Sequence, residues 1–95
     1  MPRVVRSPDA IREILEIVDY IGGDNPLAAE RWYRDLDHLF HLLSNHPSLG
    51  QRVKLGRRSF RRLTRGNYVI YHRVLADIIE IVHVIHGARD HERLI

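Results

Sequence analysis

Apolar side chains change their spacing once along this chain, and that change restricts the possible folds more than any other feature of the sequence. Between residues 8 and 46 they recur every three or four positions, which is the period of an amphipathic helix. From residue 59 to residue 85, β-branched and aromatic side chains dominate instead, as is typical of strands. Helices followed by strands predict an α+β domain in which a helical hairpin packs on one face of an antiparallel sheet.

Local signals divide the helical part into two helices. Ser7-Pro8 and Asn25-Pro26 each combine a residue that caps a helix N-terminus with a proline suited to the first helical position. Gly22-Gly23 is expected to end the first helix, and the residues before Pro47 are expected to end the second. Because the link between them is short, the two helices should run antiparallel.

The remaining elements are expected to be strands. Residues 3–6 predict a short first strand, whereas residues 47–56 are polar, contain two glycines and predict a loop. An antiparallel meander then follows, with strands over Ser59–Leu63, Tyr68–Val74 and Ile78–Ile85. The expected order is β-α-α-β-β-β with a tail from residue 87 to 95, all in one domain of residues 1–95.

Positive charge is concentrated in the middle of the chain. Seven of the 15 basic residues fall within the 14 positions from 52 to 65, where no acidic residue occurs. The other 8 basic residues stand against 12 acidic ones, a balance of −4. Such a run is typical of a solvated surface or of a binding site for an acidic partner. The acidic partner would be a phosphate backbone or an acidic protein.

Several classes of protein are excluded or disfavoured by what the sequence lacks. Cysteine is absent, which excludes a disulfide scaffold and a zinc–thiolate site. No apolar stretch is long enough to span a bilayer or to serve as a signal peptide, so we expect a soluble, cytoplasmic protein with no membrane partner. His38 and His41 can share a helix face, but no third ligand accompanies them. The sequence therefore predicts neither a metal site nor a cofactor.

Two blocks in the second half of the chain carry a family resemblance. One joins Phe60–Leu63 to Asn67–Val74, and the other runs over Ile81–Asp90 and ends in His-Gly-Ala-Arg-Asp. Together with the helical hairpin and its Asn-His-Pro close, they resemble the ParE/RelE family of plasmid stabilisation toxins over almost all 95 residues. The resemblance implies the toxin of a type II toxin–antitoxin pair. It also implies a cognate ParD-like antitoxin with an acidic C-terminal tail, through which alone the toxin would meet operator DNA.

The resemblance and the charge distribution together indicate where that antitoxin would bind. An acidic tail is attracted to the basic run, and apolar helix residues that the sheet leaves uncovered can form its groove. The expected antitoxin-binding residues are Arg57, Arg58, Arg61, Arg62 and Trp32.

The family contains two functional classes. ParE-like members resemble inhibitors of DNA gyrase, whereas RelE-like members resemble ribonucleases that cut messenger RNA in the ribosome. Ribonuclease members commonly supply basic residues on the central strands and a tyrosine near the C-terminus. Here Ser59 and Tyr68 stand where basic residues are expected, and the C-terminal tyrosine is missing. The resemblance therefore favours gyrase inhibition, which needs no catalytic residue.

The residues after the last strand are the expected gyrase-binding surface, because they should lie exposed beyond the sheet. These target-binding residues are Arg89, Asp90, His91 and Arg93, although Arg89 and Asp90 can equally form a structural ion pair. Two alternative functions stay open. One is a ribosome-dependent ribonuclease that uses Arg61, Arg89 and His91. The other is an inactive toxin that serves as an antitoxin-bound co-repressor.

Overall fold

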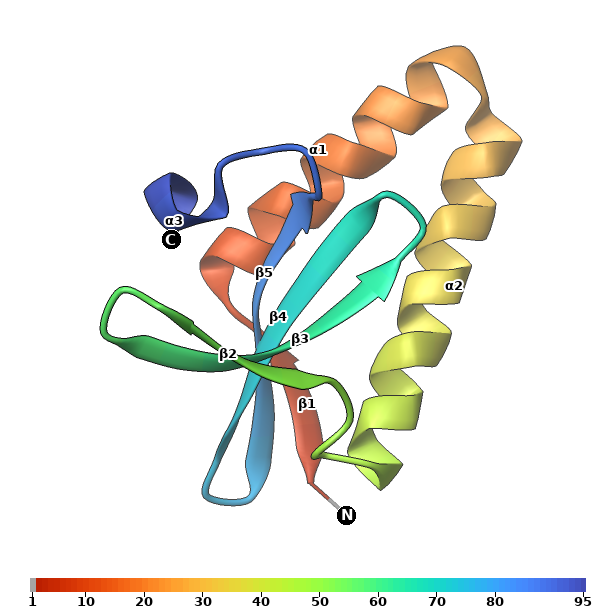
Figure 1. The fold of residues 1–95 in the computed structure, drawn as a ribbon. Helices are drawn as coiled ribbons and strands as arrows, with labels where there is room; N and C mark the ends of the chain where they lie inside the picture. Colours follow the sequence, from red (N-terminus) through yellow and green to blue (C-terminus); the bar gives the residue numbers. More distant parts are fainter. Residues whose placement is uncertain (1) are drawn as a thin grey trace.

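Two long helices cover one face of a five-stranded sheet in the computed structural model, which describes residues 2–95 (Figure 1). This arrangement confirms the predicted α+β class. The elements are β1 (Arg3–Arg6), α1 (Pro8–Asp24), α2 (Pro26–Asn45), β2 (Gln51–Leu55), β3 (Arg58–Arg65), β4 (Tyr68–Leu75), β5 (Ile78–His86) and α3 (His91–Leu94). None of the helices in the described part of the chain is long and apolar enough to cross a membrane.

The sheet has the strand order β1-β5-β4-β3-β2. Strands β2 to β5 form the predicted antiparallel meander. β1, however, runs parallel to β5, with a register from Arg3↔Ile78 to Arg6↔Ile81, so the sheet is mixed and not wholly antiparallel as expected. These two strands lie at opposite ends of the chain, and no local turn signal reports their pairing.

Part of the segment predicted as a loop over residues 47–56 is the edge strand β2. It pairs antiparallel with β3 from Gln51↔Arg62 to Leu55↔Arg58. The loop prediction was wrong because an edge strand has one solvated side and accepts polar residues, while its partner supplies the backbone hydrogen bonds. The turn that follows it contains Gly56 at a φ of 61°, a conformation that favours glycine.

The first helix continues through Gly22-Gly23, which were expected to end it, and finishes at Asp24. Asn25 then serves both helices. Its backbone N–H donates to the Ile21 carbonyl oxygen at 3.0 Å, and its side-chain oxygen accepts from the Ala28 N–H at 3.1 Å. One residue therefore terminates α1 and caps α2, as its predicted role at the start of the second helix requires.

Ser7 fastens the start of α1 to the middle of the sheet. Its hydroxyl oxygen accepts from the Ala10 N–H at 3.0 Å, which is the predicted helix cap, and its O–H donates to the Val82 carbonyl oxygen of β5 at 2.8 Å. Its backbone N–H also donates to the Ile81 carbonyl oxygen at 2.9 Å. The residue that begins the helix thus also extends the pairing of β1 with β5.

Apolar clusters cover both faces of the sheet, since neighbouring strand residues such as Val69 and Ile70 point to opposite sides. The larger cluster lies under the helices and consists of Ala10, Ile14, Leu36, Leu39, Phe40, Leu43, Ile70, Ile79, Ile81 and Val84. The smaller cluster, on the other face, consists of Phe60, Val69, Tyr71, Val82 and Ile85, with Ile95 packed against it. The tail therefore covers part of the sheet face that the two long helices leave open.

Removing the Ser7 hydroxyl should destabilise the whole domain and not only the helix end. We expect Ser7→Ala to lower the free energy of unfolding by about 1–3 kcal/mol, because a helix cap and a hydrogen bond to β5 are lost together. Urea denaturation followed by circular dichroism measures this. Asn25→Ala, which removes only an exposed cap, is the matched control and should lose less; an equal loss in both variants would contradict the link to β5.

Candidate functional site

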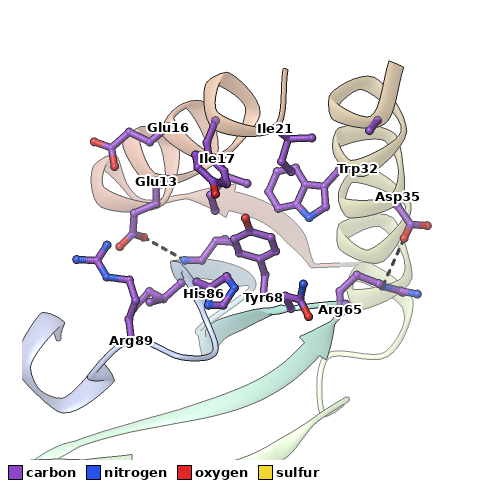
Figure 2. A pocket seen from close by; sticks show the side chains of 16 residues that line it. Glu13, Glu16, Ile17, Ile21, Trp32, Asp35, Arg65, Tyr68, His86 and Arg89 are labelled. Atoms are coloured by element: carbon purple, nitrogen blue, oxygen red, sulfur yellow. Dashed lines mark hydrogen bonds and ion pairs between the residues drawn. The ribbon is translucent and has the colours of Figure 1, made fainter. Parts of the chain in front are cut away.

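A cleft of about 900 Å³ separates the helical hairpin from one end of the sheet (Figure 2). α1 and α2 form one wall, and the β3–β4 turn and the last residues of β5 form the other. The large apolar and aromatic side chains in its lining are Ile17, Tyr20, Ile21, Trp32, Tyr68 and Ile85. The charged side chains are Glu13, Glu16, Asp35, Arg65 and Arg89. An apolar surface edged by both signs of charge suits a peptide segment more than a small ion.

Aromatic rings form the centre of this lining. The edge of one ring meets the face of the next in two successive contacts, with centroids 5.2 Å apart for Trp32 and Tyr68 and 5.3 Å apart for Tyr68 and His86. Burial raises the pKa of Tyr68 above its ordinary value of 10. Tyr20 lies at the same cleft and is 80% exposed. Tyr20 adds an exposed ring to the apolar lining of the cleft, and a contiguous exposed apolar patch of this kind is typical of a contact surface.

Glu13 holds the helix wall of the cleft against β5. Its carboxylate accepts from the Val84 N–H at 3.0 Å and lies 3.0 Å from Nδ1 of His83. The pairing of β1 with β5 ends at Ile81, so the Val84 N–H has no strand partner on that side. A buried N–H without a partner is costly, and the Glu13 carboxylate removes that penalty.

The basic run forms a second surface away from the cleft. Arg52, Lys54, Arg57, Arg58 and Arg62 are all exposed on the β2–β3 hairpin, whereas Arg61 is half-buried and donates to the Gly50 carbonyl oxygen at 3.1 Å. Trp32, which was expected to share a binding surface with Arg57, Arg58, Arg61 and Arg62, lies instead in the cleft. The cleft is at the Arg65 end of β3 and the hairpin tip is at the Arg58 end, roughly 23 Å apart at the rise of a strand.

His91 ties the tail to the sheet. The Tyr71 hydroxyl is hydrogen-bonded to Nδ1 of His91, and burial raises the pKa of Tyr71. The other ring nitrogen, Nε2, donates to the His86 carbonyl oxygen at 2.9 Å. Both nitrogens of this half-buried ring are therefore engaged within the fold. The neighbouring Arg89, Asp90 and Arg93 are exposed, and none of them forms an ion pair with another residue of the range 2–95.

The three residues considered for ribonuclease activity lie at three different places. Arg61 lines a groove beside the β2–β3 hairpin, and Arg89 lines the cleft. His91 packs on Tyr71, on the sheet face away from the helices. General acid–base catalysis needs its groups around one reacting bond, and this arrangement does not bring the three together. Within residues 2–95, histidines and carboxylates also form no cluster of three that suits a metal ion.

His72 is a buried histidine that sequence reasoning left without a role. It is fully buried, and its Nε2–H donates to the Leu49 carbonyl oxygen at 2.9 Å, which fixes the segment before β2. Burial lowers the pKa of His72, and nearby Arg61 acts in the same direction. The structural roles of Glu13 and His83 were also missed. Their only sequence signal is polarity within an otherwise apolar helix face and strand, which does not identify the partner.

Comparisons with known proteins agree on one family. Residues 4–91 match the family model described as "ParE toxin of type II toxin-antitoxin system, parDE". Among solved structures, one described as "Chromosomal ParDE TA system from P. aeruginosa" matches with a TM-score of 0.76 and 18% identity. The match covers 90% of this chain and 96% of that chain, and at such identity it shows the fold alone. None of the curated proteins matches the chain.

His72 should make the protein less stable in mild acid. Its pKa in the folded state lies below the ordinary value of 6.5, so below about pH 6.5 the unfolded chain binds a proton that the native state does not. The free energy of unfolding should therefore fall as the pH drops below that value. Urea denaturation between about pH 8 and about pH 5 measures the decline.

His72→Gln keeps a side-chain N–H for Leu49 but cannot titrate, so its stability should vary less over this range, even if it is lower throughout. The exposed His38 provides the control variant His38→Gln, which should keep the decline of the original protein. An unchanged decline in His72→Gln would assign the effect to another group.

Proposed function

The chain belongs to the family of ParE toxins of type II toxin–antitoxin systems, and we propose that it inhibits DNA gyrase and is neutralised by an acidic ParD-like antitoxin seated in the cleft. The observation that carries the antitoxin part is the aromatic lining of that cleft beside an almost fully exposed Tyr20. Inhibition of a cytoplasmic enzyme places the toxin's action in the cytoplasm. Operator DNA is reached through the DNA-binding part of the antitoxin.

The cleft offers what a disordered antitoxin tail needs in order to fold on its partner. Such a segment loses conformational entropy on binding and must bury apolar surface to offset that loss. Ile17, Ile21 and Trp32 supply apolar contacts on the helix wall. Arg89, which makes no ion pair within residues 2–95, can pair with acidic side chains of the tail, whereas Arg65 already lies 3.9 Å from Asp35. This proposal rests on the cleft and includes Trp32, but it needs none of the hairpin arginines.

The proposed gyrase contact consists of the exposed charged residues that follow β5, namely Arg89, Asp90 and Arg93. They project from a short segment that His91 holds in place, so the segment presents a defined arrangement of charges. His91 has a positioning role here, because both of its ring nitrogens are used inside the fold. Inhibition by such a surface is a matter of binding and requires no bond to be broken. The ribonuclease alternative draws no support from the separate positions of Arg61, Arg89 and His91.

Tyr20→Ala tests the antitoxin site. Tyr20 is 80% exposed, so its removal should leave the unfolding midpoint unchanged while weakening the antitoxin complex by about tenfold or more, as expected for an aromatic contact in an interface. Isothermal titration calorimetry with the protein encoded beside the toxin gene measures the affinity. Leu27→Ala, on an exposed residue that lies outside the cleft lining, is the control. Equal affinities of both variants for the antitoxin would show that the antitoxin does not bind in the cleft.

Purified gyrase tests the target directly. The toxin should inhibit supercoiling of relaxed plasmid, and Arg89→Ala/Arg93→Ala should weaken this inhibition by about tenfold because the charges that face gyrase are lost. Arg3→Ala/Arg31→Ala makes the same change in net charge at exposed positions elsewhere and should inhibit normally. Unaffected supercoiling would contradict the gyrase proposal. If the toxin also cleaved messenger RNA in a translation extract, the ribosome would be the target instead.

A further inference from the structure

The β2–β3 hairpin projects from the sheet as a two-stranded ribbon (Figure 1, green). β3 pairs with β4 only over Arg61–Arg65, whereas β2 pairs with β3 out to Leu55↔Arg58. The outer half of the hairpin therefore has no third strand beside it. A two-stranded ribbon with no third strand beside it has a shape that fits the major groove of duplex DNA, which is about 12 Å wide.

Positive charge on this ribbon is not neutralised by the rest of the chain. Arg52, Lys54, Arg57, Arg58 and Arg62 are exposed, and none of them makes an ion pair within residues 2–95. In addition, Arg52 lies directly opposite Arg61 across the two strands. Like charges in such a pair repel each other, and an anion bound between them relieves that repulsion.

The same charges continue into a groove of about 680 Å³ beside the hairpin. Its basic lining residues are Arg52, Lys54, Arg61 and Arg73, and no acidic side chain lines it. Arg73 is already paired with Glu80 at 2.8 Å, and Arg61 contacts the Gly50 carbonyl oxygen. Arg52 and Lys54 are left with no side-chain hydrogen bond or ion pair to the described residues, so their charges are available to a ligand.

The ribbon lacks exposed apolar and aromatic side chains, and this property distinguishes between the kinds of anionic ligand that it could bind. Phe60 is 3% exposed, and Val53 and Leu55 pack against the smaller apolar cluster. Single-stranded nucleic acid is bound largely by stacking of its bases on exposed aromatic rings, and this surface offers none. A disordered acidic peptide would find the exposed Val74 in the adjoining groove but no exposed apolar side chain on the hairpin itself, which is little to offset its ordering. Duplex DNA is already ordered and carries one negative charge per about 1.7 Å of helix axis.

We infer that the β2–β3 hairpin binds the phosphate backbone of duplex DNA without sequence preference. Arg52, Lys54, Arg57, Arg58 and Arg62 contact phosphate oxygens, and the separate position of the cleft leaves this surface open when the cleft is filled. Phosphate contacts carry no sequence information, so they differ from the specific operator contact of the antitoxin. The inference does not rest on the gyrase proposal, since it concerns binding to DNA by the toxin alone.

Fluorescence anisotropy with the purified full-length chain tests the inference without gyrase or antitoxin. The probes are two labelled DNA duplexes of unrelated sequence, and the competitors are a single-stranded RNA of the same length and polyglutamate. The chain should bind both duplexes equally, and the logarithm of the binding constant should fall linearly with the logarithm of the salt concentration. Neither competitor should displace the duplex as well as unlabelled duplex does.

Arg52→Gln/Arg57→Gln is the informative variant, because neither side chain has a partner within the described residues and folding should be unaffected. We expect it to bind duplex at least about tenfold more weakly and to reduce the salt slope by about 2. Arg3→Gln/Arg31→Gln changes net charge equally, away from the hairpin, and should bind almost as the original protein does. Circular dichroism confirms that each variant is folded.

Three results would overturn the inference. The first is the absence of duplex binding at low salt, and the second is equal weakening in the hairpin variant and the control variant. The third is stronger competition by RNA or polyglutamate than by unlabelled duplex, which would identify the hairpin as an RNA-binding or an acidic-protein-binding surface. Gyrase inhibition by a chain that does not bind DNA would leave the gyrase proposal intact and refute this one alone.

Discussion

The outer edge of β5 has backbone groups that need hydrogen-bond partners, and strand β1, the helix-capping residue Ser7 and the side chain of Glu13 supply them in succession. β1 pairs with β5 as far as Ile81. Ser7 then donates hydrogen bonds to the carbonyl oxygens of Ile81 and Val82. The Glu13 carboxylate accepts a hydrogen bond from the Val84 N–H. Because Ser7 caps α1 and Glu13 lies in its second turn, satisfying this edge also fixes the helix. The helical hairpin can then diverge from the sheet beyond Glu13, and the cleft opens there.

β3 carries a functional candidate at each of its ends. Its last residue, Arg65, lines the cleft, and its first residue, Arg58, belongs to the projecting basic hairpin. The two surfaces therefore differ in place as well as in chemistry. The cleft combines aromatic rings with both signs of charge, whereas the charged side chains of the hairpin are all cationic. A domain of 95 residues can in this way present separate surfaces to a protein tail and to a polyanion.

A simple deletion of the tail would not separate its part in folding from its proposed part in binding gyrase. Ile95 packs against the smaller apolar cluster, and His91 links Tyr71 to the His86 carbonyl oxygen, so the segment contributes to the core. Its remaining residues are exposed and charged, as a contact surface would be. Removing the tail would uncover apolar surface in a domain whose stability is modest for its size. Substitution of the exposed side chains changes the proposed contact surface without disturbing the core, whereas truncation of the tail changes both.

The sequence by itself determined the elements whose signals are local. Helical spacing, the caps at Ser7 and Asn25, and the β-branched runs predicted two helices and the last three strands, and the family blocks near the C-terminus indicated the toxin family. Tertiary structure alone decided the parallel pairing of β1 with β5 and the strand character of β2. It also decided the hydrogen bonds of Glu13, His72 and His91, and the separation of Trp32 from the basic run. The reason is physical: helix and strand periods depend on neighbours within a few residues, whereas these features depend on partners brought together only when the sheet and helices pack.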